Sequence, residues 1–197
     1  MAVHWETVKH EVTKASTATG FWAKGLGTEA ERSTALPTLD VNGLSGGYQG
    51  TGIKTIIPAQ ASFKVSMRLV ADQDPEEIAE QFTQYVIGFE TDLVDVEVHV
   101  LAKGMPVATE IEGTLTNAVR ETMEVTLRKR VTLARVGASV PIGGMFKKEL
   151  QAPISILNVG VGNNIHSPNE YLELGHFRTG IEMLIRFYFG FGSAAQQ

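Results

Sequence analysis

Two stretches of the chain alternate strictly between apolar and polar residues, which is the pattern of a β-strand with one buried face. In the first stretch, residues 62–69, the apolar positions are Phe63, Val65, Met67 and Leu69. In the second stretch, residues 94–100, every other residue is a valine and the residues between are polar. A shorter strand is predicted for residues 38–41, and the glycine-rich residues 43–52 predict a tightly turning loop after it.

Apolar residues at helical spacing predict helices elsewhere in the chain. The best-marked helix start is at residues 74–77. There Asp74 is placed as the cap, Pro75 stands at the first helical position, and Glu77 is expected to reach back as in a capping box. The other predicted helices are residues 5–16, 116–128, 141–150 and 174–188.

Residues 154–160 form a short, continuous apolar run that predicts a buried strand. From residue 38 onward the predicted order is therefore two strands, a helix and a strand, all half-buried, followed by two helices, a strand and a helix. The first set is typical of an antiparallel sheet with helices on one face, and the second is typical of the closing part of an α/β domain. The sequence predicts an α+β protein whose character changes near residue 104.

The composition excludes several classes of protein. At 197 residues, with 43% hydrophobic and 20% charged residues, the chain is long enough for one domain or two small ones with a sizeable core. A net charge of −5 argues against a nucleic-acid surface, and the lack of cysteine excludes disulfides and thiolate metal ligands. No apolar run reaches the ~18 residues of a membrane span, and the first residues lack the apolar core of a signal peptide, so we predict a cytoplasmic protein.

A polar loop at residues 163–170 (Asn-Asn-Ile-His-Ser-Pro-Asn-Glu) is the strongest candidate for chemistry. It follows the predicted strand at 154–160 and precedes the predicted helix at 174–188. Open α/β sheets place ligands in such loops, which makes His166 a candidate metal ligand. A zinc site normally takes three or four protein ligands, so a surface or loop-packing role for this single histidine is the alternative.

Five segments carry a resemblance to a known family. They are residues 37–43 with 46–48, 54–58, 66–70, 137–141 and 164–170. In this order and at these separations they resemble the second half of the zinc-dependent dipeptidase, aminoacylase and desuccinylase superfamily, and most closely its carnosine-dipeptidase-like branch. The resemblance implies that residues 36–103 form an incomplete, ferredoxin-like lid or dimerisation domain. It also implies that residues 104–197 form the C-terminal portion of the catalytic domain, whereas residues 1–35 match poorly.

The resemblance implies that His166 is the last ligand of a two-zinc centre. In the family the other ligands come from a His-x-Asp segment, a bridging Asp, a Glu-Glu pair whose first member is the general base, and a later Asp. No His-x-Asp sequence occurs in this chain. Its one Glu-Glu pair, Glu76 and Glu77, opens a helix, where capping is the better interpretation. We therefore expect His166 as a metal ligand and no catalytic residue in this chain.

The resemblance also implies four substrate-binding residues, each of which has a structural alternative. Ser139 corresponds to a serine that holds the carboxylate end of the substrate, and before Pro141 it also suits a helix cap, which is compatible with binding. Arg68 stands at the substrate-anchoring position, although an outward arginine on an alternating strand is more often solvated. Thr55 and Asn42 match lid positions that reach toward the active site of the partner subunit. The alternative for Thr55 is a residue that simply favours a strand, and the alternative for Asn42 is a turn residue.

These patterns predict a fragment of a zinc-dependent metallohydrolase that cleaves the amide bond of dipeptides or N-acyl amino acids. We expect it to be inactive alone, because most metal ligands and the general base are missing. A separate N-terminal catalytic half, an upstream reading frame or a frameshifted gene would account for the missing parts. The alternative is a non-catalytic dimerisation or interaction module derived from the same family. A homodimer is expected in either case, without nucleic acid or membrane as partners.

Overall fold

A computed structural model of the protein describes residues 9–10, 13, 25, 27–135, 137 and 140–194. The chain divides into two compact units: unit 1 is Met1–Val107 with Ala134–Gly144, and unit 2 is Ala108–Leu133 with Met145–Gln197. Each unit combines helices with a small antiparallel sheet, so the predicted α+β class is confirmed. The helix predicted at residues 5–16 lies outside the described residues except for Lys9, His10 and Thr13, which are helical.

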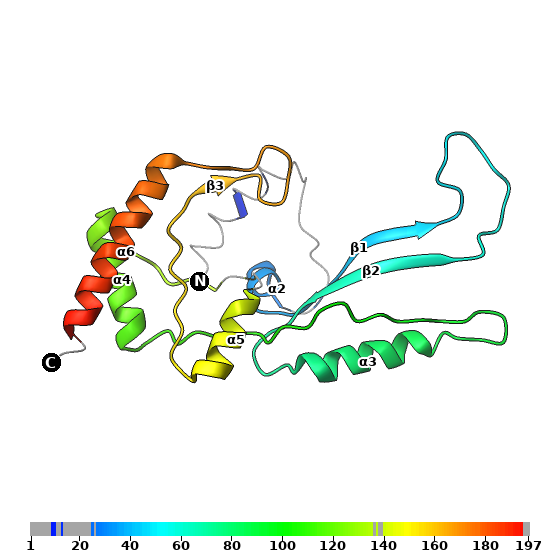
Figure 1. The fold of residues 1–197 in the computed structure, drawn as a ribbon, viewed down its shortest axis with the longest axis horizontal. Helices are drawn as coiled ribbons and strands as arrows, with labels where there is room; N and C mark the ends of the chain where they lie inside the picture. Colours follow the sequence, from blue (N-terminus) through cyan, green and yellow to red (C-terminus); the bar gives the residue numbers. More distant parts are fainter. Residues whose placement is uncertain are drawn as a thin grey trace. The chain divides into compact units, whose positions relative to one another are not determined.

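A β-hairpin is the main feature of unit 1 (Figure 1). Strands β1 (Thr38–Gly46) and β2 (Ala61–Arg68) pair antiparallel, with Thr38 opposite Arg68 and Gly46 opposite Ala61. The register shifts between Val41 and Gly43, which makes Asn42 the extra residue of a β-bulge. Strand β1 is longer than predicted, because the first glycines of the expected loop belong to the strand and the turn begins only after Gly46.

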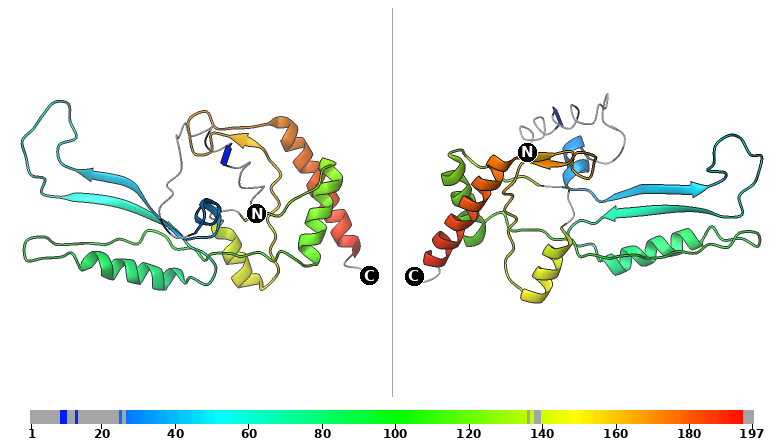
Figure 2. Two further views of the ribbon diagram at one scale, coloured as in Figure 1. Left: turned by 180° about the vertical axis from the view of Figure 1, so that it is seen from behind. Right: turned by 45° about the horizontal axis from the view of Figure 1, so that its top comes forward.

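The alternation predicted for β2 is confirmed in part, because Phe63 is 50% exposed. Val65 and Met67 are half-buried, whereas the polar residues between and beside them are exposed. Helix α3 (Pro75–Ile87) runs along this hairpin in both views of Figure 2.

The start of α3 is capped as predicted, with one difference. The Asp74 carboxylate accepts hydrogen bonds from the backbone N–H groups of Glu76 at 2.7 Å and Glu77 at 3.3 Å, and Pro75 stands in the first turn. Within the described residues Glu77 makes no return bond to the Asp74 backbone N–H, and its carboxylate accepts a hydrogen bond from the Gln81 side-chain amide at 2.9 Å. The prediction of a full capping box was therefore wrong, while the cap itself is confirmed.

We expect Asp74→Ala to lower the free energy of unfolding by about 1 kcal/mol, because two backbone N–H groups at the start of α3 lose their acceptor. Urea unfolding followed by circular dichroism would measure the change. Asp95→Ala is the control, because Asp95 is exposed and makes no hydrogen bond or ion pair within the described residues. Equal destabilisation by the two substitutions would show that the cap contributes nothing specific.

Residues 94–100 do not form the predicted strand. They are extended, but their only ladder contact among the described residues is an isolated bridge between Thr91 and Val94. The predicted burial is seen in part, since Val96 and Val98 are half-buried and the residues between them are exposed. The alternating pattern specifies an extended backbone with one buried face, whereas a ladder also needs a neighbouring strand. In the part of the chain that the structure describes, β2 pairs only with β1.

A short helix, α2 (Glu29–Thr34), precedes the hairpin, and a capping box formed by Thr28 and Glu31 caps its N-terminus. The Thr28 hydroxyl accepts from the backbone of Glu31, and the Glu31 carboxylate accepts from the Thr28 backbone at 2.7 Å. The Thr28 backbone N–H, and then its hydroxyl, hold the pKa of the Glu31 carboxyl below its usual value.

Unit 2 is built around two helices, α4 (Thr114–Leu127) and α6 (Leu174–Ala194), which pack side by side (Figure 1). Val119 of α4 and Met183 of α6 are buried in this unit. Thr116 is also buried, and its hydroxyl donates to the Glu110 carbonyl at 2.8 Å. The helices predicted at 116–128 and 174–188 are thus confirmed, with α6 extending further. Helix α5 (Pro141–Leu150) has its predicted bounds, beginning in unit 1 and ending in unit 2.

Residues 154–160 are extended but are not paired as the predicted buried strand. No backbone N–H or C=O of residues 154–159 makes a hydrogen bond within the part of the chain that the structure describes. The segment instead lies against α6, where a Cβ added to Gly180 would stand 2.6 Å from the Val159 carbonyl oxygen. The prediction of a buried strand was therefore wrong, since these residues belong to no strand of the structure and Ile156 is 55% exposed.

The described residues bury few apolar side chains. Among them only Val119 and Met183 form a buried hydrophobic core, and many large apolar side chains of both units remain exposed. A chain of this length would ordinarily bury more than half of its surface on folding. None of the described helices is both long and apolar enough to cross a membrane. Each unit therefore presents apolar surface that it does not cover itself.

Candidate functional site

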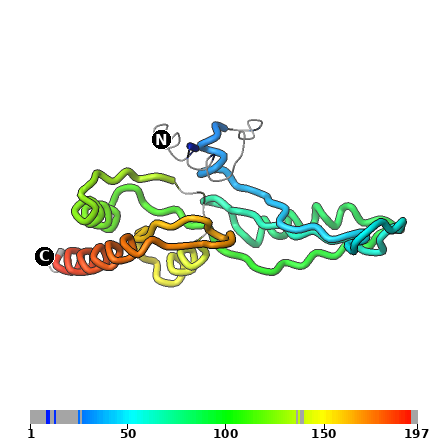
Figure 3. The backbone as a smooth tube through the Cα atoms, turned by 90° about the horizontal axis from the view of Figure 1, so that it is seen from above, coloured from blue at the N-terminus to red at the C-terminus, as the bar shows by residue number. Residues whose placement is uncertain are grey.

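His166 lies at the tip of a small hairpin in unit 2. Strands β3 (Gly162–Asn163) and β4 (Tyr171–Leu172) pair antiparallel and form the base of the hairpin, in the orange part of the tube that precedes α6 in Figure 3. Across the tip, the Ser167 backbone N–H donates to the Asn164 carbonyl at 2.8 Å. The short ladder and this turn fix where the histidine stands.

Three non-glycine residues of this tip have left-handed backbone conformations: Asn164 with φ 59°, His166 with φ 61° and Asn169 with φ 60°. Each such residue costs on the order of 1–2 kcal/mol, although asparagine and histidine adopt this region more readily than most residues. Such strain persists where surrounding contacts enforce it and is concentrated at functional sites. Asn164, His166 and Asn169 thus share the left-handed conformation that turns the chain at this tip.

Two longer hydrogen bonds join residues within this tip. The His166 backbone N–H points to the Glu170 carboxylate at 3.4 Å, and the Asn164 side-chain amide points to the Asn169 carbonyl at 3.4 Å. The His166 side chain is exposed. The tip thus presents an imidazole to its surroundings while the backbone is held from within the loop.

The described residues do not complete a metal site around His166. No group of three or more His, Cys, Asp or Glu side chains that could hold a metal ion occurs among them. A zinc ion requires three or four protein ligands, and a two-metal centre requires more. The residues present therefore do not fit a complete zinc centre in this part of the chain.

The predicted substrate residues of unit 1 lie at different points along its hairpin. Arg68 ends β2 opposite Thr38, and it is exposed. Asn42 is the exposed bulge residue of β1, so the expected turn is replaced by a bulge. Thr55 lies exposed in the loop between the two strands and is not part of a strand. The structure places these three in unit 1 and His166 in unit 2, while Ser139 lies outside the described residues.

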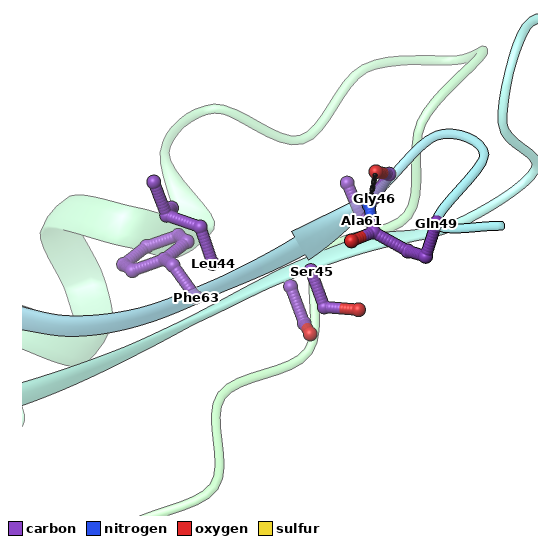
Figure 4. A pocket seen from close by; sticks show the side chains of 7 residues that line it. Leu44, Ser45, Gly46, Gln49, Ala61 and Phe63 are labelled. Carbon is purple, nitrogen blue, oxygen red and sulfur yellow. Dashed lines mark hydrogen bonds between the residues drawn. The ribbon is translucent and has the colours of Figure 1, made fainter. Parts of the chain in front are cut away.

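A hollow of about 490 Å³ lies at the end of the β1–β2 hairpin. Leu44 and Phe63 point to one side of the two strands and Ser45 to the other, and the Gln49 amide donates to the Gly46 carbonyl at 2.6 Å (Figure 4). None of the lining residues carries a titratable side chain. The hollow therefore has no group for acid–base catalysis.

A second hollow lies within unit 2, and we call it the unit 2 groove. It measures about 330 Å³ and is lined by Leu115, Val119, Phe146, Leu150, Ala152, Pro153, Ile154, Ser155, Leu157, Leu184, Phe187 and Tyr188. The lining is almost entirely apolar. Sequence reasoning missed the groove because its residues come from α4, α5, the extended residues 152–157 and α6, which are far apart along the chain.

Comparison with known proteins places the chain in context. The model of peptidase family M20/M25/M40 matches residues 4–189. The beta-Ala-His dipeptidase of Rattus norvegicus is 26% identical over 156 residues, which cover 77% of this chain and 32% of the relative. The Cys-Gly metallodipeptidase of Candida albicans is 28% identical over 164 residues, covering 81% of this chain and 34% of the relative. This chain thus spans about a third of the length of these relatives.

Solved structures also match this chain over only part of their own length. An M20 family metallo-carboxypeptidase from Sulfolobus solfataricus matches with a TM-score of 0.73 and 26% identity, covering 90% of this chain and 41% of that chain. Human carnosine dipeptidase 1 matches with a TM-score of 0.73 and 21% identity, covering 91% of this chain and 39% of that chain. The fold described above therefore recurs within chains more than twice as long.

Proposed function

Because this chain belongs to peptidase family M20/M25/M40 and matches its dipeptidase-like branch, we propose that it is part of a zinc-dependent hydrolase that cleaves the amide bond of dipeptides or N-acyl amino acids. The observation that carries the proposal is the structural match to the metallo-carboxypeptidase over 90% of the chain. The strained tip at His166 supports it from within the chain.

In this proposal each predicted residue has one task. His166 provides one imidazole to a metal site whose other ligands lie outside the described residues. The metal, when bound, would supply Lewis acidity and an activated water. Arg68 and Ser139 hold the carboxylate end of the substrate, since a guanidinium can take a carboxylate through two bonds. Asn42 and Thr55 contact substrate from the lid, residues 36–103. A homodimer and a cytoplasmic location stay predictions from the sequence.

The isolated chain is expected to hydrolyse neither Cys-Gly nor beta-Ala-His, because one histidine cannot hold two metal ions or act as the general base. Peptidase assays with added zinc, together with metal analysis of the purified chain, check this. His166→Ala is the control variant. Zinc-dependent turnover that survives clean purification and disappears in His166→Ala would show that the chain is a complete enzyme.

The second candidate function is a non-catalytic interaction module. The large exposed apolar surface and the lack of a metal-binding cluster among the described residues favour it. The two functions differ in what His166 does. In a module, His166→Ala leaves metal content unchanged in every assembly that the chain forms.

A further inference from the structure

Asn42 occupies the irregular position of the β1–β2 ladder. Val41 on one side of it pairs with Val65. Gly43 on the other side pairs with Lys64, so Asn42 has no partner on β2. A bulge residue is left out of the ladder, and the hydrogen bonding beside it is locally disrupted. The peptide bond between Asn42 and Gly43 therefore lies where the pairing of the two strands restrains the backbone least.

The side chain of Asn42 is not held by any contact. It is exposed, and within the described residues its amide makes no hydrogen bond. The next residue, Gly43, carries no side chain that could shield its backbone nitrogen. Asparagine is a labile residue, because the backbone nitrogen that follows it can attack its side-chain carbonyl carbon. At Asn42 these two groups are neighbours with no side chain between them.

The other five asparagines of the chain lack this combination, since none of them is followed by glycine. Four of them also have side chains that are held. The side-chain oxygens of Asn117, Asn158 and Asn163 accept hydrogen bonds at 2.8 Å, 3.3 Å and 2.8 Å. The Asn164 side chain donates to a backbone carbonyl of its own loop at 3.4 Å. Each of these four would have to break a contact before it could react.

Asn169 differs from Asn42 chiefly in the residue that follows it. It is exposed, and its side chain makes no hydrogen bond in the part of the chain that the structure describes. Glu170 follows it, and the side chain of Glu170 obstructs approach to its own backbone nitrogen. Asn169 is therefore an internal reference: an asparagine whose side chain is equally free, but without the glycine.

We propose that Asn42 and Gly43 form a self-modification site, at which Asn42 converts to aspartate or isoaspartate without an enzyme. The backbone nitrogen of Gly43 gives its proton to water and bonds to the side-chain carbonyl carbon of Asn42. The bond from that carbon to the side-chain nitrogen breaks, and this nitrogen takes a proton from water and leaves as ammonia. Water then adds to either carbonyl carbon of the resulting cyclic imide, and the bond from that carbon to the Gly43 nitrogen breaks. The sum is one water consumed and one ammonia released.

The products change the charge of β1 and, for isoaspartate, the path of its backbone. Either product adds one carboxylate to the exposed side of the strand. Isoaspartate also routes the main chain through the former side chain, which adds one backbone atom. The bulge already holds a residue outside the ladder, so we expect the pairs on both sides of it to persist. The proposal does not rest on the proposed peptidase function, because both reacting groups belong to this chain and the co-reactant is water.

The test incubates the full chain at neutral pH in water enriched in heavy oxygen and follows its peptides by mass spectrometry. We expect the peptide with Asn42 to take up one heavy oxygen at least ~10-fold faster than the peptide with Asn169, because only Asn42 precedes an unshielded backbone nitrogen. The same comparison is made on the chain unfolded in guanidinium chloride. The rate at Asn42 in the folded chain should lie within ~10-fold of its rate in the unfolded chain, because the bulge leaves this residue outside the ladder.

Gly43→Ala isolates the role of the glycine. A Cβ at Gly43 would stand 3.7 Å from the nearest atom of the Lys64 side chain, which is an ordinary contact, so the variant should keep the hairpin. It should slow conversion of Asn42 at least ~10-fold, because the added methyl group obstructs the backbone nitrogen. Gly175→Ala is the control, since a Cβ there meets nothing within 4 Å, and it should leave the rate at Asn42 unchanged. Circular dichroism verifies that both variants fold.

Three results would overturn the proposal: equal rates at Asn42 and Asn169 in the folded chain, conversion of Asn42 only after unfolding, or an unchanged rate in Gly43→Ala. The first two comparisons need no variant, so they decide the matter even if Gly43→Ala misfolds. None of these measurements involves a metal ion or peptidase turnover. Lack of turnover in the assays above would therefore count against the proposed function and leave this site unaffected.

Discussion

Dipeptide hydrolysis is expected to appear when this chain replaces the matching part of the Sulfolobus solfataricus metallo-carboxypeptidase in a single fused chain, and His166→Ala is expected to abolish it. The fusion supplies further metal ligands, whereas the described residues of this chain hold no group of three or more side chains that could bind a metal ion. A metal centre loses its geometry when one ligand is removed, so zinc content and kcat should fall together. We expect a loss of at least ~100-fold in kcat, which corresponds to about 2.7 kcal/mol of barrier.

A second substitution in the same fusion separates metal binding from substrate binding. Arg68→Ala should raise KM with a smaller change in kcat, because a guanidinium–carboxylate contact is made in the ground state as well as in the transition state. Lys64→Ala is the control, since Lys64 is an exposed cation of the same strand. Unchanged zinc stoichiometry in His166→Ala would remove His166 as a ligand. Equal kinetics in the Arg68 and Lys64 variants would identify Arg68 as a solvated surface residue.

Gly180→Ala should lower the free energy of unfolding of unit 2 by about 1–3 kcal/mol, which is the usual cost of forcing extra volume into a packed contact. The added Cβ would stand 2.6 Å from the Val159 carbonyl oxygen and 2.8 Å from the Val159 Cβ. The first of these atoms belongs to the backbone, so α6 and the extended segment would have to separate. Thermal or urea unfolding followed by helix content measures the change.

Gly190→Ala in the same helix provides the matched control. A Cβ at Gly190 meets nothing within 4 Å, so the substitution adds helix propensity without a clash. It should stabilise α6 by up to about 1 kcal/mol. Gly180→Ala should therefore lower the free energy of unfolding, whereas Gly190→Ala should raise it. If both stabilise, the close approach of Gly180 to Val159 does not exist in solution.

Local signals in the sequence predicted the local structure well, because their causes are local. Asp74 and Pro75 specify a helix start through contacts within one turn, and α3 begins there. The alternation in residues 62–69 specifies one buried face, and β2 shows it at Val65 and Met67, which are half-buried, but not at Phe63. The strands predicted for residues 94–100 and 154–160 are not formed, and the reason is different. Their patterns specify extended backbone, but a ladder depends on a neighbouring strand that sequence periodicity does not reveal.

The candidate site was predictable only where a motif marked it. The loop around His166 was found from residue types and from resemblance, and its left-handed tip fits the asparagines at 164 and 169, which tolerate that conformation. The bulge at Asn42 was not predicted, since an Asn-Gly pair favours a turn when taken alone. The unit 2 groove could not be predicted, because it forms only when α4, α5 and α6 come together in space.

The packing of α4 on α6 has a consequence for the order in which the chain is made. Helix α4 ends at Leu127, and α6 begins only at Leu174. At roughly 5–20 residues per second, translation needs several seconds to produce the stretch between them. During that time the apolar face of α4 around Val119 has no partner, and a chaperone or a neighbouring nascent chain can reach it. Polysome-bound chains arrested between these two helices should therefore be the species most prone to aggregation during synthesis.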